Sequence, residues 1–392
     1  MSKTRTYDIV LFGATGFTGQ LTAEYLARHG GDKLRWALAG RNLDKLEQVR
    51  ARLVDINAGC RDLALLEADI GDDASMRRIA QAARVVVTTV GPYIEYGEPL
   101  VRACADNGTD YVDLTGEPEF VDKMWLRYHE SARASGARIV HCCGFDSIPH
   151  DLGVWFTVKQ LPEGVPLRVQ GFVRAGGQFS GGTLHSAVTA FSRLRQYAGI
   201  SRQRRHEEGD PVDRNVGSIH HGLRFERALG TWALPMPTID PQIVRRSAAA
   251  IDRYGPDFRY GHFVQLKKIS SVAKLVAGAG ALFVGSQFRP TRERLLALRA
   301  PGQGPSEQQR NKGWFKVTFL GDGGGRHVRC EVSGGDPGYG ETSKMLAESA
   351  LCLAFDKLPN VAGVVTTAQA MGDALIERLQ RAGIAFRVAE SS

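Results

Sequence analysis

Short apolar segments alternate with amphipathic segments over the first 145 residues of the chain. The apolar segments have the length and composition of buried strands, and the segments between them carry apolar residues at helical spacing. The expected strands are residues 7–12, 35–39, 64–68, 85–90, 111–114 and 138–142, and the expected helices are 17–29, 42–54, 73–83, 97–107 and 118–135. Because strands that alternate with helices form a parallel sheet covered on both faces, residues 1–145 are predicted to be a doubly wound α/β domain.

This alternation stops after Gly144. Longer strands are expected at 167–175, 314–320 and 326–332, the last two as a hairpin. The tail is expected to form helices at 339–358 and 366–381 and a strand at 385–388. These patterns divide the chain into a first domain at 1–145, a second domain at 146–337 and C-terminal helices at 338–392. The tail helices carry apolar faces that need a partner, so we expect them to pack back on the first domain.

The composition is that of an ordinary globular protein with room for two domains. The chain has 392 residues, of which 43% are apolar and 23% are charged, and 50 basic against 42 acidic residues give a net charge of +8. This charge is compatible with anionic ligands and does not call for a nucleic-acid partner. Six scattered cysteines without a CxxC pair predict buried reduced thiols in a cytoplasmic protein and no metal site. Nothing in the sequence specifies an oligomeric state.

An uncharged apolar run covers residues 275–288, between Lys274 and Arg289. Its fourteen residues fall short of the about 20 that a membrane-spanning helix needs, so no transmembrane span is predicted. The favoured interpretation is a buried helix rich in glycine and alanine. The alternatives are an acyl-binding tunnel and a helix resting on a membrane surface, because basic residues flank the run.

The clearest chemical signal lies between the first expected strand and the first expected helix. It is the sequence Gly13-Ala14-Thr15-Gly16-Phe17-Thr18-Gly19. In this place Gly13 permits a tight turn, Gly16 lets the backbone approach a pyrophosphate, and Gly19 allows the helix and strand to pack closely. The free N–H groups at the start of the helix then bind the phosphates. The loop in this context predicts a Rossmann-type dinucleotide-binding domain.

The end of the second expected strand indicates which dinucleotide is bound. NAD sites usually carry Asp or Glu there, to bind the ribose 2′-hydroxyl. This chain has Arg41 instead, and a guanidinium matches a 2′-phosphate. We therefore expect NADP(H), with an exposed, solvated Arg41 as the alternative. Asp69, after the third strand, is a candidate contact to the adenine amino group.

Other candidate site residues follow the later strands. The backbone at Gly91 and Pro92 is expected to run close to the nicotinamide ribose, since both follow the fourth strand. Tyr93 and His150 are the candidate proton donors, and each has a purely structural alternative. The polar residues at 113–117 either bind substrate or cap the next helix, with capping favoured. No tyrosine is followed four residues later by lysine, so the Tyr-Lys pair of short-chain dehydrogenases is missing.

Seven segments together resemble the saccharopine dehydrogenase-like oxidoreductase family. They are GATGFTG at 13–19, AGR at 39–41, VGPY at 90–93, DLTGE at 113–117, GFDSIPHDLG at 144–153, GYGETSKM at 338–345 and AMGDALIERL at 370–379. The chain is most similar to the branch of bacterial trans-acting enoyl reductases, although the segment 193–310 matches weakly. The resemblance implies a nicotinamide-binding domain, a second α+β domain with an antiparallel sheet, and reduction of a lipid-like substrate.

Two functional hypotheses follow from the motifs and this resemblance. The first is an NADP(H)-dependent reductase of an enoyl or related double bond in a large acyl substrate, delivered on a carrier or at the membrane. The second is a non-catalytic protein that binds the dinucleotide and acts by associating with lipid or protein; the missing acid/base pair favours it. Five arginines, 193, 195, 202, 204 and 205, form either a solvated face or a docking site for an anionic carrier.

Overall fold

The computed structural model describes residues 5–176, 193–209, 214–297 and 304–391. The chain divides into two compact units, each built from separate stretches of sequence. The first consists of Met1–Phe145, Gly302–Gly304 and Tyr339–Ala382, and the second of Asp146–Pro301, Pro305–Gly338 and Gly383–Ser392.

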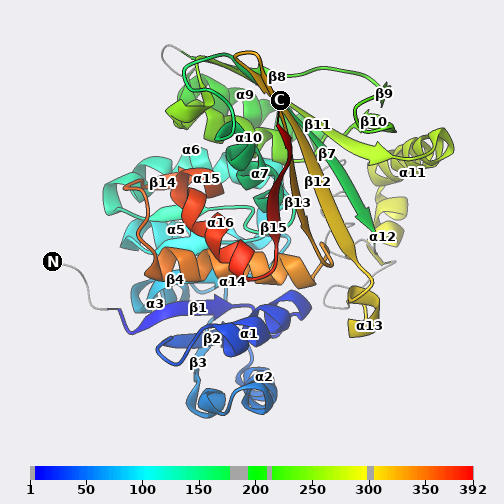
Figure 1. The fold of residues 1–392 in the computed structure, drawn as a ribbon. Coiled ribbons are helices and arrows are strands. Elements are labelled where there is room, and N and C mark those ends of the chain that lie inside the picture. The colour runs from blue at the N-terminus through cyan, green and yellow to red at the C-terminus, as the bar shows by residue number, and fades with distance from the viewer. Residues whose placement is uncertain (1–4, 177–192, 210–213, 298–303, 392) are drawn as a thin grey trace. The chain divides into compact units, whose positions relative to one another are not determined.

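The first unit is built on a seven-stranded parallel sheet in the order β14-β6-β5-β4-β1-β2-β3 (Figure 1). Its strands are β1 (Tyr7–Phe12), β2 (Trp36–Gly40), β3 (Ala64–Glu67), β4 (Ala83–Thr88), β5 (Asp110–Val112), β6 (Arg138–Val140) and β14 (Gly363–Val365). The doubly wound α/β fold predicted for the N-terminal part is therefore confirmed. Strand β14 was not predicted, since three residues are too few to show a strand pattern.

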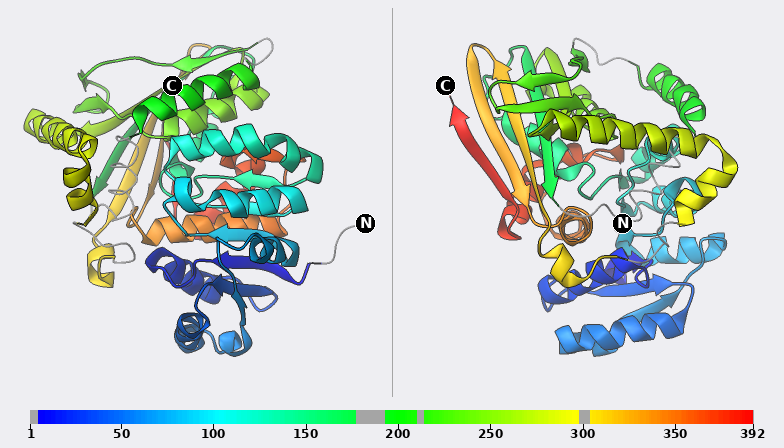
Figure 2. Two further views of the ribbon diagram at one scale, coloured as in Figure 1. Left: turned by 180° about the vertical axis from the view of Figure 1, so that it is seen from behind. Right: turned by 90° about the vertical axis from the view of Figure 1, so that its right-hand side faces the viewer.

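Helices cover both faces of this sheet. They are α1 (Phe17–His29), α2 (Leu43–Ile56), α3 (Asp73–Ala82), α4 (Tyr93–Tyr96), α5 (Glu98–Asn107), α6 (Pro118–Ser135), α14 (Gly340–Phe355), α15 (Thr367–Ala370) and α16 (Gly372–Arg381), with a 3-10 turn η1 (Ala58–Asp62). Helix α14 packs on α1 and on strands β1, β4 and β5, whereas α3, α5 and α6 pack side by side (Figure 2). Twelve residues of α14 are buried, so this helix is part of the core of the first unit.

The second unit is built on a mixed sheet in the order β15-β13-β12-β7-β11-β10-β9, with β8 paired to β11. Its strands are β7 (Leu167–Gly176), β8 (Asn215–Ser218), β9 (Arg224–Glu226), β10 (Thr231–Pro235), β11 (Asp257–Leu266), β12 (Trp314–Gly323), β13 (Arg326–Gly334) and β15 (Ala385–Ser391). The expected hairpin is present as β12 and β13. The sheet is not purely antiparallel, because β11 runs parallel to both β7 and β8.

The helices of the second unit lie mainly between Asp146 and Arg310. They are α7 (Ile148–Val158), α9 (Leu194–Glu208), α10 (Asp240–Ala250), α11 (Ile269–Gln287), α12 (Arg289–Ala297) and α13 (Glu307–Arg310), with a 3-10 turn η2 (Asp252–Tyr254). Helix α7 packs on β7, β12 and β13, and α10 packs on α7, β8 and β11. The tail is shared between the units, since β15 pairs with β13 while α14 and α16 belong to the first unit.

Helix α11 contains most of the apolar run 275–288, and it is not a buried helix. The favoured interpretation of this run is therefore wrong. Only 11% of its apolar window is buried, and Val276 and Val284 are 51% and 57% exposed. Among the described residues it is the one helix long and apolar enough to cross a membrane, judged by length and composition alone. The sequence argument ended the run at Lys274, but the helix continues through this residue to Ile269.

Candidate functional site

Two of the three glycines in the motif at 13–19, which runs from the end of β1 into α1, are required by the fold itself. Gly13 has a φ of 88°, a left-handed conformation that favours glycine, and a Cβ there would lie 2.6 Å from Val90 Cγ2. A Cβ on Gly19 would lie 2.2 Å from the carbonyl oxygen of Gly13. A side chain at either position would displace the backbone or its neighbours, whatever the loop binds.

Gly16 differs, because the protein leaves room for a side chain there. Its backbone is extended (φ −75°, ψ 162°), and the neighbour nearest to an added methyl group would be the Gly13 carbonyl oxygen, at an ordinary 3.5 Å. Gly16 is the N-cap residue of α1 and supplies no side-chain cap, so the first N–H groups of the helix have no acceptor within the helix. Open space and N–H donors at the positive end of a helix form a cradle for an anion.

The other loop residues hold this cradle in place. Ala14 is completely buried, and the Thr15 carbonyl accepts a hydrogen bond from the Gln20 side chain at 2.8 Å. The ring of Phe17 packs edge-on against Tyr339, with 4.8 Å between centroids. The Thr18 carbonyl accepts hydrogen bonds from the hydroxyls of Thr22 and Ser343, at 2.9 and 3.4 Å. The loop is thus fixed by α1 and by the start of α14.

The strand order changes direction next to this loop. Strands β2 and β3 lie on one side of β1, and β4, β5 and β6 lie on the other. The two strands at this switch point are joined at their ends, where the Thr89 hydroxyl donates to the Gly13 carbonyl at 3.1 Å. Ligands of open α/β sheets bind at the carboxyl ends of strands at such a point. Gly91, which is exposed, and the half-buried Pro92 follow β4 at this edge. Their contact with the nicotinamide ribose stays a prediction.

The end of β2 presents an available guanidinium. Arg41 is exposed, and within the described part of the chain no carboxylate forms an ion pair with it. Asn42, beside it, caps α2 by accepting a hydrogen bond from the Lys45 N–H. Asp69 is exposed after β3, and one of its oxygens accepts the Gly71 N–H at 2.8 Å in a local turn. That turn explains Asp69 without a ligand, so its adenine contact stays a prediction.

Tyr93 is buried in the hydrophobic core of the first unit, beside Phe120, rather than open to the sheet edge. Its side chain is 4% exposed, and its hydroxyl donates to the Thr88 carbonyl at 3.1 Å. Burial and the nearby Asp113 carboxylate raise the pKa of Tyr93 well above its ordinary value. The Glu117 carboxylate accepts the N–H groups of Tyr93 and Ile94, at 3.0 and 2.9 Å, and so holds the start of α4. These contacts describe a positioned, neutral tyrosine, whose role as a proton donor remains a prediction.

A buried Asp–His pair lies at the ends of β5 and β6, where sequence reasoning had favoured helix capping. Asp113 Oδ2 is 2.6 Å from His141 Nδ1, and Asp113 also accepts the Tyr111 hydroxyl and the N–H groups of Thr115 and Cys142. The Asp113 side chain is completely buried and that of His141 is 2% exposed. No sequence motif marks this pair, because its members are 28 residues apart, each directly after one of two neighbouring strands.

His150 belongs to the second unit and lies in a second buried group. It stands in the first turn of α7, with Nε2 3.7 Å from Asp240 Oδ1, and Asp240 Oδ2 is 3.5 Å from His262 Nε2. Burial, reinforced by the neighbouring His262, lowers the pKa of His150 well below its ordinary value, and burial lowers that of His262 to about 3. Burial also raises the pKa of Asp240. Sequence reasoning found His150 and missed its two neighbours.

The comparisons with known proteins agree with these features. The family model for the saccharopine dehydrogenase NADP binding domain matches residues 9–140. Trans-acting enoyl reductases of Mycobacterium bovis and Mycobacterium ulcerans are 37% and 36% identical; the first alignment covers 97% of both chains and the second 98% of both. A Mycobacterium tuberculosis protein that is named as a proposed trans-acting enoyl reductase is 40% identical, and the alignment covers 98% of this chain and 97% of that protein. The chain belongs to the saccharopine dehydrogenase-like oxidoreductases, in the branch of the trans-acting enoyl reductases.

The fold of this oxidoreductase agrees with a solved structure of the wider family. Apo saccharopine dehydrogenase (L-Glu forming) from Saccharomyces cerevisiae matches 98% of this chain and 100% of its own, with a TM-score of 0.57 and 11% identity. At this identity the match concerns the fold alone. The assignment of NADP(H) as the cofactor is based on the match to the NADP binding domain. The described residues fit it, since the cradle at Gly16 suits a pyrophosphate and Arg41 suits a 2′-phosphate.

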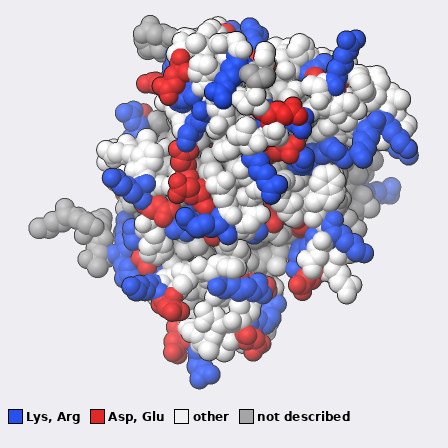
Figure 3. Space-filling view, viewed as in Figure 1, with Lys and Arg blue, Asp and Glu red and all other residues white. Residues whose placement is uncertain are grey.

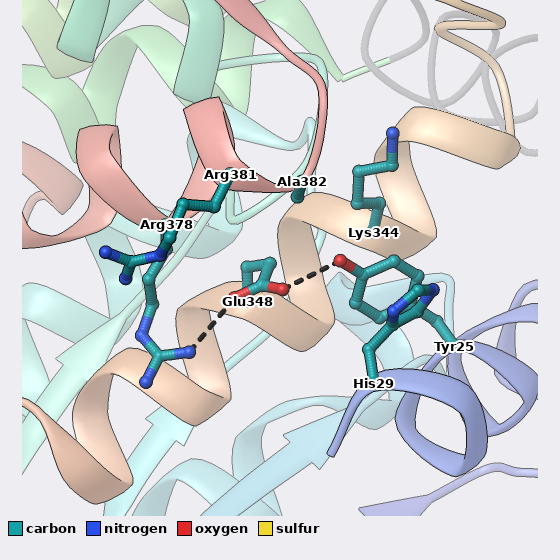
Figure 4. A pocket seen from close by; sticks show the side chains of 7 residues that line it. All are labelled: Tyr25, His29, Lys344, Glu348, Arg378, Arg381 and Ala382. Atoms are coloured by element: carbon teal, nitrogen blue, oxygen red, sulfur yellow. Dashed lines mark hydrogen bonds and ion pairs between the residues drawn. The ribbon is translucent and has the colours of Figure 1, made fainter. Parts of the chain in front are cut away.

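The oxidoreductase has another recess, between α1, α14 and α16 (Figure 4), with a volume of about 450 Å³. At its centre Glu348 accepts the Tyr25 hydroxyl at 2.7 Å and pairs with Arg378 at 3.2 Å. Arg378 also binds Asp356 at 2.5 Å, so its guanidinium is occupied. His29, at the C-terminal end of α1, lines this recess, which is therefore at the other end of the helix from the glycine loop.

The arginine-rich segment of this oxidoreductase forms α9, a helix not expected from the sequence. Arg204 is 3% exposed and paired with Glu208 at 2.8 Å, so it does not belong to a solvated patch. Arg202 and Arg205 are exposed. Arg204 therefore takes no part in a docking surface, and a docking role for the other arginines of this segment stays a prediction.

Proposed function

We propose that this protein reduces the carbon–carbon double bond of an enoyl group in a long acyl chain. NADPH, when bound, supplies a hydride to one carbon of the double bond, and the other carbon receives a proton. The observation that carries this proposal is the identity of 36–37% to trans-acting enoyl reductases over 97–98% of both chains. The same similarity argues against a non-catalytic dinucleotide-binding protein.

Different residues of the first unit are proposed to bind different parts of the cofactor. The cradle at Gly16 and the first N–H groups of α1 hold the pyrophosphate, and Arg41 binds the 2′-phosphate. Gly91 and Pro92 leave the backbone at the switch point free of bulky side chains. Asp69 is proposed to reach the adenine amino group through the carboxylate oxygen that the local turn does not use.

The proton donor is proposed from two candidates, Tyr93 and His150, which lie in different units. The Tyr93 hydroxyl already donates to the Thr88 carbonyl, so it would have to turn away to protonate a substrate. Burial and the neighbouring His262 lower the pKa of His150, which disfavours the protonated form that donates, so His150 would have to take up a proton before it protonates a substrate. Substitutions Tyr93→Phe and His150→Asn test them separately, since loss of the donor lowers kcat and leaves NADPH affinity unchanged.

The experiment for the reaction uses purified protein, NADPH and a long-chain trans-2-enoyl thioester. We expect NADPH to be consumed and the acyl product to gain two hydrogen atoms, one from the cofactor hydride and one from solvent, whereas the saturated thioester gives no turnover. An intact protein that binds NADPH and leaves long-chain enoyl thioesters unreduced, both free and carrier-bound, would refute the proposal.

Helix α11 supports a lipid-like substrate and contact with a membrane surface. The side chains of Val276, Val284 and Phe288, which directly follows the helix, are 51%, 57% and 62% exposed. The surface over this helix is largely uncharged, with basic side chains along its border (Figure 3). Lys267 and Lys268 precede the helix and are exposed, so their charged groups can contact an anionic membrane surface. We place α11 in the interfacial layer of the bilayer, where a membrane-held acyl substrate is available.

Binding to anionic phospholipid vesicles tests this placement. Burial of the Val276 and Val284 side chains in lipid, each only in part, contributes roughly 2–3 kcal/mol to the free energy of membrane binding. The double variant Val276→Ser, Val284→Ser should therefore bind vesicles at least tenfold more weakly. The matched control is Leu223→Ser, which removes an apolar side chain that is 45% exposed elsewhere in the second unit. Equal binding by both variants would remove α11 from the membrane contact.

A further inference from the structure

Three side chains from three separate elements of the second unit converge in its interior. His150 comes from the first turn of α7, Asp240 is the first residue of α10, and His262 lies within β11. The His150 Nε2–Asp240 Oδ1 and His262 Nε2–Asp240 Oδ2 distances are 3.7 and 3.5 Å. One nitrogen or oxygen atom from each residue lies within 4.8 Å of the other two, and the two imidazole rings meet edge-on at 4.9 Å.

All three side chains are buried, and two of them, Asp240 and His262, carry a polar atom without a hydrogen-bond partner among the described residues. The side chains of His150, Asp240 and His262 are 1%, 2% and 1% exposed. Within the residues that the structure describes, Asp240 Oδ1 and His262 Nε2 have no hydrogen-bond partner. Buried polar groups in native proteins are nearly always paired, so two such atoms in one buried group indicate that they bind a water molecule or an ion.

The neighbouring groups orient these atoms toward the shared space. The hydroxyl of Tyr260 is 3.0 Å from His262 Nδ1, on the far side of the ring from Nε2. When Nδ1 carries the ring proton and donates it to Tyr260, the lone pair of His262 lies on Nε2. The Thr238 hydroxyl donates to Asp240 Oδ2. Outer hydrogen bonds of this kind fix the tautomer and orientation of ligands in metal sites.

We propose that His150, Asp240 and His262 bind a divalent transition-metal ion, with zinc, cobalt(II) and iron(II) as the suitable chemical class. Two imidazoles and one carboxylate are a common ligand set for these ions. Metal–ligand bonds of about 2.0–2.1 Å in a tetrahedral site place ligand atoms roughly 3.3 Å apart. The two contacts to Asp240, one through each carboxylate oxygen, exceed that separation by only a few tenths of an ångström. The ligand atoms of the group lie up to 4.8 Å apart, so binding an ion requires the side chains to move closer together. A water molecule or a substrate atom completes the coordination.

Sequence reasoning predicted no metal because the ligands form no local motif. Asp240 lies 90 residues after His150, and His262 lies 22 residues after Asp240. Only the packing of α7, α10 and β11 brings them together. The site also gives His150 a different role from proton donation, since a ring nitrogen bound to a cation holds that ring in place as a ligand.

The experiment is a titration of chelator-treated, intact protein with cobalt(II), followed by visible absorption and elemental analysis. We expect one ion per chain and the intense visible bands of a tetrahedral or five-coordinate site. His262→Gln and Asp240→Asn should each weaken cobalt binding by at least tenfold and abolish these bands. His221→Gln, an exposed histidine of the same unit, is the matched control and should bind as the wild type does.

Tyr260→Phe keeps the ring packing and removes only the outer hydrogen bond, so it separates ligation from folding. We expect it to weaken cobalt binding about 10–100-fold with an unchanged far-ultraviolet spectrum. Absence of visible bands in the wild type, or equal binding by His262→Gln and His221→Gln, would overturn the proposal. NADPH binding is measured on the same samples, so failure of the metal site is distinguished from failure of the proposed reductase.

Discussion

Gly16→Ala should weaken cofactor binding without unfolding the protein. The backbone at Gly16 (φ −75°, ψ 162°) is open to alanine, and the new methyl group would meet the Gly13 carbonyl oxygen at an ordinary 3.5 Å. Replacing glycine by alanine at an N-cap costs at most about 1 kcal/mol. The same methyl group would occupy the space through which a pyrophosphate approaches α1. We therefore expect NADPH affinity to fall at least tenfold, or about 1.4 kcal/mol.

Gly19→Ala is the matched control for this substitution. Its methyl group would lie 2.2 Å from the Gly13 carbonyl oxygen and 2.9 Å from Thr89 Oγ1, so the loop and β4 must separate. We expect a loss of stability of about 1–3 kcal/mol, the range for overpacking. Thermal unfolding without ligand and NADPH fluorescence titration measure the two effects. If Gly16→Ala unfolds as readily as Gly19→Ala, or binds NADPH with wild-type affinity, the cradle is wrongly placed.

Three further predictions concern the first unit. Arg41→Ala should weaken NADPH by roughly 1.5–3 kcal/mol and NADH little, since only NADPH carries the 2′-phosphate; equal titration curves for both cofactors would contradict this. Arg378→Met removes the ion-pair partner of Glu348 and Asp356 and should lower the free energy of unfolding by about 1–3 kcal/mol in denaturant titrations. Burial raises the pKa of Asp356, but Arg378 lowers it by more, so the pKa lies below the ordinary 3.8. The loss of stability in Arg378→Met should therefore be complete above pH 3.8 and become smaller as the pH falls below it. Truncation after Pro337 should give insoluble protein, and a soluble fragment with full NADPH affinity would show that α14 is dispensable.

The N-terminal sheet could be predicted from sequence because its signals are local. A strand such as β2 is a continuous apolar run, and the glycine motif from Gly13 to Gly19 directly follows a strand and leads into a helix. The choice of NADP(H) needed one residue, Arg41, at the end of β2. Periodicity and turn chemistry fix such features within about 20 residues of chain.

The second unit could not be predicted in the same way, because its contacts are distant in sequence. Strand β7 pairs with β11 in parallel and with β12 in antiparallel orientation, and neither pairing leaves a local pattern. The group of His150, Asp240 and His262 depends on three elements meeting in space. Helix α11 was misjudged for another reason, since an apolar run shows what a helix could bury and not whether the protein buries it.

The division of the C-terminal segment between two sheets has a consequence for biosynthesis. Strand β14 completes the first sheet beside β6, and β15 completes the second beside β13. Until β14 and β15 have been synthesised, β6 and β13 are uncovered edge strands, and such edges invite aggregation. Neither sheet can therefore be completed from the segments that precede Gly363. The yield of the protein in the cell should depend on chaperones that cover those two edges during synthesis.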